Sequence, residues 1–186
     1  PEVFGQFPLV LLIQGLAASF SSIQGGEFLI SRRGDVKGVY GTVFTADVIL
    51  STITVLIVLA AARPLMGITG QPDLAWFLRV SILACLVQPF GMVGALANRE
   101  LDFWRTGSVQ IVGILLGPVL KLALVAAGFG LWSLILGELV RQCVEVGILW
   151  YRAPDRPTWG LDRAILVDTL RFSFPVALTG IITFYY

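Results

Sequence analysis

Four charged residues that could do chemistry lie inside long apolar stretches: Lys121, Glu138, Arg141 and Glu145. A charge at the centre of a membrane-spanning helix costs about 2.5–3.5 kcal/mol on insertion scales, so it usually faces a partner or a watery cavity. At 100° per residue, the last three share one helical face and form an acid–base–acid stripe. These charges must therefore be paired with one another or with a bound molecule.

The spacing of the charges around a turn predicts that Lys121 meets Glu138. Gly128-Phe129-Gly130 is typical of a tight hairpin, with Lys121 eight residues before Phe129 and Glu138 nine after it. At 1.5 Å per residue, both lie roughly 12–14 Å below the same rim. Lys121 also shares a helical face with Gly113 and Gly117, and glycines at this spacing allow another helix to approach closely. We therefore expect Lys121 to point into a helix bundle.

Two interpretations of this charged cluster remain open. In the first, Lys121–Glu138 and Arg141–Glu145 are structural ion pairs that fix helix packing, and their charges sum to zero. In the second, the helices line a hydrated cavity whose cations hold an anionic cargo. Buried ion pairs stabilise less than apolar packing does, which favours the second interpretation.

Two further helical stripes are polar and add two candidate cavity residues. Gln14 shares a face with Ser21, and Asp47 shares a face with Ser51. We expect these stripes to face a common lumen. The position of Asp47 near the predicted cytoplasmic end favours another role for this residue, at a solvated helix start.

The elements that position these residues are predicted from composition. Of 186 residues, 56% are hydrophobic and 13% are charged, with a mean hydropathy of +0.86, whereas soluble domains carry about 25% charged residues. This excludes a soluble enzyme, a nucleic-acid binder and a disordered linker. The chain has no histidine, which excludes a histidine-ligated metal and a histidine base. We also expect no cofactor. Cys85 and Cys143 lie in apolar runs, which favours buried thiols over a disulfide.

We predict an all-α integral membrane protein whose residues 1–186 form one bundle of about six transmembrane helices. A span needs about 20 apolar residues. Five segments meet this length and a sixth is short: 4–23, 43–62, 78–96, 109–129, 131–151 and 172–186. Pro64 is expected to end the second span. Because the chain starts with Pro1 and its last span is short, we expect it to be part of a longer transporter chain.

The orientation follows from the Lys and Arg residues outside the spans, which are enriched in cytoplasmic loops. Only Arg63 and Arg79 fall on one side of the predicted membrane. Nine fall on the other side: Arg32, Arg33, Lys37, Arg99, Arg105, Arg152, Arg156, Arg163 and Arg171. We therefore predict that the loop after the first span is cytoplasmic.

Several strings along the chain resemble those of a known family. They are Pro1-Glu2-Val3-Phe4-Gly5, Leu29-Ile30-Ser31-Arg32-Arg33-Gly34-Asp35, Ala97-Asn98-Arg99-Glu100-Leu101-Asp102-Phe103-Trp104-Arg105, Gly128-Phe129-Gly130-Leu131-Trp132-Ser133-Leu134 and Arg171-Phe172-Ser173-Phe174-Pro175. In this order and spacing they resemble the polysaccharide flippases, the exporters of O-antigen and lipid-linked oligosaccharides. That family belongs to the multidrug/oligosaccharidyl-lipid/polysaccharide exporter superfamily.

The resemblance implies part of the N-terminal half of a two-bundle flippase with 12–14 helices in the bacterial inner membrane. One helix would precede the chain and a second half would follow it. The implied activity is export of a polyprenyl-diphosphate-linked glycan by alternating access, in contact with the bilayer and with polysaccharide polymerase machinery. The candidate translocation residues are Lys121, Arg141, Glu138, Glu145, Asp47 and Gln14, with no catalytic residue among them.

Two other functions remain as alternatives. A multidrug or organic-cation antiporter of the same superfamily would use the acidic side chains as its working groups. A membrane-embedded glycosyltransferase or acyltransferase would need clustered carboxylates or a histidine at the membrane rim. The sequence has no histidine and only scattered acids near the predicted cytoplasmic face: Glu27, Asp35, Glu100 and Asp102.

Overall fold

A computed structural model of the chain describes all residues except 1, 24, 33–35 and 174–186. All regular structure in the described residues is helical, which confirms the predicted all-α class. The elements are α1 (Glu2–Phe20), α2 (Gly25–Ser31), α3 (Lys37–Ile68), the 3₁₀ helix η1 (Pro72–Leu74), α4 (Ala75–Ser81), α5 (Ala84–Val87), the 3₁₀ helix η2 (Gln88–Met92), α6 (Val93–Arg99), α7 (Phe103–Ala126) and α8 (Trp132–Arg152). Residues 163–173 form a further helix.

The helices are long and apolar enough for a membrane protein. Among the described residues, three segments have the length and composition of a span: Gly38–Ile68, Pro72–Arg99 and Phe103–Ala126. The bent pair α1–α2 makes a fourth if it crosses as one span. The charged helix α8 is not among these segments, although its 21 residues reach about 31 Å. The membrane character is confirmed, whereas six crossings and a single bundle over 1–186 stay predictions.

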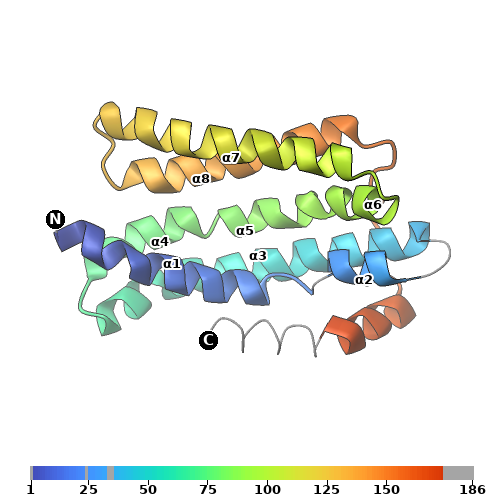
Figure 1. Ribbon diagram of the computed structural model, residues 1–186. Helices are drawn as coiled ribbons and strands as arrows, with labels where there is room; N and C mark the ends of the chain where they lie inside the picture. The colour runs from blue at the N-terminus through green and yellow to red at the C-terminus, as the bar shows by residue number, and fades with distance from the viewer. Residues whose placement is uncertain (1, 24, 33–35, 174–186) are drawn as a thin grey trace.

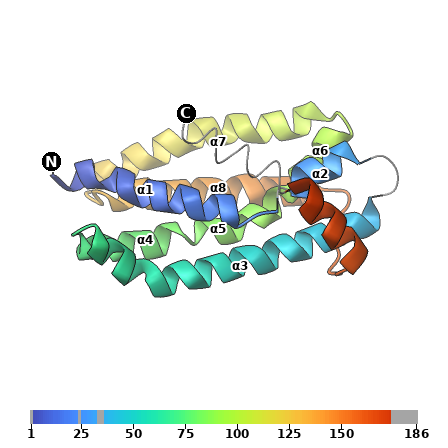
Figure 2. The same ribbon diagram turned by 90° about the horizontal axis from the view of Figure 1, so that it is seen from below.

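The long helices lie side by side along one direction (Figures 1 and 2). The α7–α8 hairpin packs on the α4–α6 segment, and α1 packs against α3 and α4. One apolar core joins α1, α3, α4 and α8 around Val10, Met66 and Leu78. The other joins α2, α3 and η2 around Leu29 and Phe44. We call the end where α6 meets α7 and where α8 ends the basic end, since it carries Arg99, Arg105 and Arg152.

The third predicted span, 78–96, is an interrupted helix. The helical pattern breaks at residues 82–83, between α4 and α5, and tightens to the 3₁₀ helix η2 around Pro89. The Phe90 carbonyl in η2 accepts a hydrogen bond from the Trp150 indole N–H of α8, at 2.7 Å. Such 3₁₀ turns have poorer backbone hydrogen bonds than an α-helix, so a side-chain donor stabilises this segment.

Two predictions about local structure are wrong. Pro64 does not end the second helix, because α3 continues through it to Ile68. A proline removes one backbone donor, and membrane helices tolerate this when neighbouring groups compensate. Cys143 is exposed rather than buried, while Cys85 is buried as expected. Most of the predicted sixth span, 172–186, lies outside the described residues.

Candidate functional site

The hairpin between α7 and α8 sets the geometry of the charged cluster. Gly128 and Gly130 have φ angles of +87° and +54°, a backbone conformation that glycine adopts without steric cost. The two helices therefore run antiparallel, and Lys121 Nζ lies 2.9 Å from Glu138 Oε2. The prediction that these two residues meet at the same depth is confirmed.

Lys121 and the three charged residues of α8 form one connected chain. Glu138 accepts from Lys121 and from the Arg141 guanidinium, and Arg141 Nη1 lies 2.5 Å from Glu145 Oε1. Gln142 Nε2 also donates to Glu138 Oε1, at 3.3 Å. Two cations and two carboxylates are thereby paired, so the cluster carries no net charge.

Three glycines make room for these charged side chains. A Cβ at Gly117 would lie 2.8 Å from Arg141 Cδ, and one at Gly137 would lie 2.6 Å from Lys121 Cγ. A Cβ at Gly113 would collide with the Glu145 carboxylate. The Gly113–Gly117 face does pack against another helix, as predicted. Charged side chains of α8 occupy the space at Gly113 and Gly117, and Lys121 of α7 occupies the space at Gly137.

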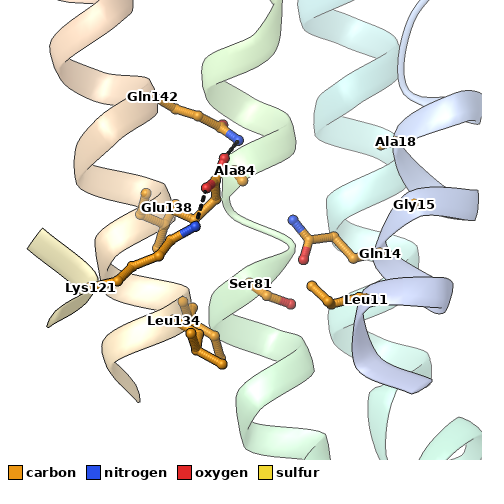
Figure 3. Close-up of a pocket in the computed structure, with 12 residues that line it drawn as sticks. Leu11, Gln14, Gly15, Ala18, Ser81, Ala84, Lys121, Leu134, Glu138 and Gln142 are labelled. Atoms are coloured by element: carbon orange, nitrogen blue, oxygen red, sulfur yellow. Dashed lines mark hydrogen bonds and ion pairs between the residues drawn. The ribbon is translucent and has the colours of Figure 1, made fainter. Parts of the chain in front are cut away.

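A cavity of about 530 Å³ opens beside this cluster, between α1, the α4–α5 break, α7 and α8. Lys121 and Glu138 line one wall, and Gln14 lines the facing wall on α1 (Figure 3). Ser81 and Gln142 add a hydroxyl and an amide. The remaining lining residues are small or apolar: Leu11, Gly15, Ala18, Ala84, Leu134, Ile135 and Leu139. The cavity thus offers a few convergent polar groups in apolar walls, which is typical of a binding site.

The structure divides the predicted site residues between three places. Lys121, Glu138 and Gln14 share the cavity, whereas Arg141 and Glu145 are absent from its lining and lie against the α7 glycines. Sequence reasoning did not single out Ser81 and Gln142 as cavity residues. Gln142 had a usable signal, because it follows Glu138 by one helical turn.

Asp47 lies away from the cavity, at the junction between α1 and α2. Its side chain is 3% exposed and accepts hydrogen bonds from the Ile23 backbone N–H, at 2.8 Å, and the Ser22 hydroxyl, at 3.3 Å. The alternative prediction of a solvated position near a helix start is therefore wrong. The lumen-facing role predicted for Asp47 stays a prediction, and the observed contacts are those of a cap for the α1–α2 junction.

No cluster suited to a metal ion is present in the part of the chain that the structure describes. The chemistry available to the cavity is that of hydrogen bonding and charge pairing. Its groups are an ammonium, a carboxylate, two amides and a hydroxyl. These groups can bind the hydroxyls or charges of a polar molecule.

Two known proteins are similar in sequence to this chain. The chain is 28% identical over 178 residues to the succinoglycan biosynthesis transport protein ExoT of Rhizobium meliloti (strain 1021), covering 94% of this chain and 35% of that protein. It is 27% identical over 188 residues to the lipopolysaccharide biosynthesis protein WzxC of Escherichia coli (strain K12), covering 97% of this chain and 37% of that protein. The chain thus spans about a third of the length of these relatives. No solved structure matches it significantly.

The family assignment covers the entire sequence. A family model described as polysaccharide biosynthesis protein matches residues 1–186. The resemblance seen in the sequence motifs is thereby confirmed at the level of the family. The chain is a membrane protein that belongs to the polysaccharide biosynthesis protein family.

Proposed function

We propose that the protein containing this chain moves an undecaprenyl-diphosphate-linked oligosaccharide across the bacterial inner membrane for surface polysaccharide biosynthesis, without catalysing a reaction. The observation that carries this proposal is the cavity beside Lys121 and Glu138, whose apolar walls carry a few convergent polar groups. A hydrated path for sugars through a bilayer needs such groups, because hydrocarbon offers sugar hydroxyls no hydrogen-bond partner. The names of ExoT and WzxC support a polysaccharide as the cargo.

The cavity residues would bind the glycan part of the cargo. Lys121 donates and Glu138 accepts, so the pair can hold sugar hydroxyls on both sides, with the amide of Gln14 facing them. Arg141 and Glu145 would hold this pair in position. An incoming diphosphate would have to compete with Glu138 for Lys121, since both cations are already paired.

Alternating access would move the cavity walls relative to each other. The Gln14 wall belongs to α1, which packs on α3 and α4, while the Lys121–Glu138 wall belongs to the α7–α8 hairpin. The α4–α5 break at residues 82–83 lies between the two walls. Discontinuous helices of this kind often flank the substrate sites of transporters. A second bundle, and polysaccharide polymerase machinery as a partner, belong to the proposal for the full-length protein.

Complementation tests this function. A bacterial strain without its own exporter receives the full-length protein, either unchanged or with Lys121→Met and Glu138→Gln together. This double variant removes both charges and leaves no unpaired ion in the membrane. We expect surface polysaccharide to fall at least tenfold at equal protein level, while the control Arg163→Ala, at an exposed arginine, keeps it.

Three outcomes would count against the proposal. Full surface polysaccharide in the double variant would remove the cavity pair from transport. Failure of the unchanged protein to restore any polysaccharide would remove the flippase function. Drug resistance without polysaccharide would favour the antiporter instead.

A further inference from the structure

A second hollow lies at the basic end of the bundle, far from the transport cavity. It measures about 490 Å³ and is lined by Asp102, Trp104, Arg105, Arg152 and Pro154. The start of α7 and the end of α8 form it. Arg105 precedes Lys121 by 16 residues on α7, which places the two about 24 Å apart along the helix. The two sites are therefore separate.

The arginines of this hollow differ from the cations in the cavity because no carboxylate neutralises them. Within the described part of the chain, Arg105 Nη2 is buried without a hydrogen-bond partner. Arg152 Nη1 donates to the neutral Ser108 hydroxyl at 2.8 Å, and neither arginine forms an ion pair with a described residue. A buried guanidinium nitrogen without an acceptor is costly, so an anion that reached Arg105 and Arg152 would be stabilised by two guanidinium groups that no carboxylate of the described residues pairs with.

The acidic residues near these arginines do not fill that role. Asp102 Oδ1 accepts from the Arg105 backbone N–H, at 3.3 Å, and thereby caps α7. Glu100 and Asp155 line a separate crevice, which Arg105 also lines. That crevice has a volume of about 10 Å³, which is at the lower limit for a single water molecule. Of these two depressions, the hollow shared by the two arginines is the one with room for a phosphate.

Exposed aromatic residues place the hollow at the level of the lipid headgroups. Trp104 is 81% exposed and neighbouring Phe103 is 61% exposed. Such rings are enriched at the membrane–water interface, where one side is apolar and one edge is wet. Two guanidinium groups beside an interfacial ring match the chemistry of a phosphate ester that carries acyl or prenyl chains.

We propose that Arg105 and Arg152 bind the phosphate of an anionic membrane lipid at the basic end, with Trp104 against its hydrocarbon chain. The guanidinium groups donate hydrogen bonds to the phosphate oxygens and offset their negative charge. The hydrocarbon chain of the same lipid lies in the surrounding bilayer. This site does not depend on the transport proposed for the cavity. Both a phospholipid and a polyprenyl phosphate carry the required group.

Fluorescence quenching tests the site in the full-length protein in detergent. Phosphatidylglycerol and phosphatidylcholine with brominated chains are compared, and the Trp104 signal is the difference between the unchanged protein and Trp104→Phe. We expect half-maximal quenching at a phosphatidylglycerol concentration at least five times lower than for phosphatidylcholine. Arg105→Gln with Arg152→Gln should abolish this preference, whereas Arg163→Gln, which removes an exposed charge from the same end, should keep it.

Competition distinguishes the source of the phosphate. Displacement by undecaprenyl phosphate below the concentration needed for phosphatidylglycerol would identify the lipid carrier, and weaker displacement would identify a phospholipid. Both results support a lipid phosphate site. Displacement by inorganic phosphate alone, equal quenching by the two brominated lipids, or a preference that survives the double substitution would each overturn the proposal.

Discussion

Lys121 and Glu138 form an ion pair of 2.9 Å across the α7–α8 hairpin, and both side chains line the cavity beside it. One turn further along α8, Arg141 lies between Glu138 and Glu145 and against Gly117, outside the cavity lining. The same cluster therefore has one part that can meet a cargo and one part that packs helices. Substitutions can separate these two roles.

Exchanging the two charges tests whether the pair does more than hold the hairpin together. Lys121→Glu with Glu138→Lys keeps an ion pair but places the cation on α8, next to Arg141. We expect a reduced protein level, because the exchange also replaces the carboxylate that pairs with Arg141. Compared at equal protein level, surface polysaccharide should still be at least tenfold lower. The single Lys121→Glu variant, which sets two acids against each other, should also lose protein level. Normal polysaccharide in the exchanged variant would show that the pair is structural only.

Leucine at Gly117 should destabilise the hairpin. The added side chain would overlap Arg141, whose Cδ lies 2.8 Å from the position of a Cβ at Gly117. Overpacking of this kind costs about 1–3 kcal/mol, so the melting temperature in detergent should fall by several degrees. Gly107→Leu is the control on the same helix, because no atom lies within 4 Å of a Cβ there. Equal melting temperatures for the two variants would contradict the packing described here.

Removing the carboxylate of Asp47 should weaken the α1–α2 junction. Asp47→Ala leaves the buried Ile23 N–H without this acceptor, at a cost of about 1–3 kcal/mol. Asp47→Asn keeps a side-chain oxygen for the same bond and should lose less stability. Thermal unfolding of both variants in detergent checks this order. If Asp47→Ala unfolds at the temperature of the unchanged protein, the junction does not depend on Asp47.

Replacing Trp150 by Phe should destabilise the interrupted third span. The substitution removes the indole donor to the Phe90 carbonyl and keeps an aromatic ring near Phe44 and Phe90. We expect a loss of about 1 kcal/mol, measured by thermal unfolding. Trp159→Phe is the matched control. The ring centroids of Trp159 and Phe44 are also close, 5.2 Å apart, but Trp159 is 68% exposed. A larger loss for Trp159→Phe would contradict the role assigned to the indole hydrogen bond.

The sequence was sufficient to predict the Lys121–Glu138 pair because its determinants are local. Two glycines fix the hairpin, and the rise per residue then fixes the depth of each residue that follows. The helical class was equally predictable, since a bilayer leaves few alternatives for apolar segments of this length.

The features of the fold and of the site that could not be predicted depend on contacts between segments distant in the sequence. The position of Asp47 is set by the backbone of Ile23, in the connection between α1 and α2, and the periodicity of polar residues along one helix does not reveal that partner. Arg141 shares a helical face with Glu138, but Gly117 on α7 provides the space that keeps it outside the cavity. Hydropathy predicted 78–96 as one span without a break, because apolar content does not report the 3₁₀ segment at Pro89.

Water access to Gln14 tests whether the cavity is hydrated and holds the cargo. In the full-length protein with Cys85 and Cys143 replaced by alanine, Gln14→Cys is exposed to a water-soluble maleimide, and Leu122→Cys on the exposed face of α7 is the control. A hydrated cavity at Gln14 predicts rapid labelling at position 14 and little at position 122. If the cavity also holds the cargo, added lipid-linked oligosaccharide slows the labelling at position 14. Labelling at position 14 as slow as at position 122, or unchanged by the oligosaccharide, would contradict a hydrated cavity that holds the cargo.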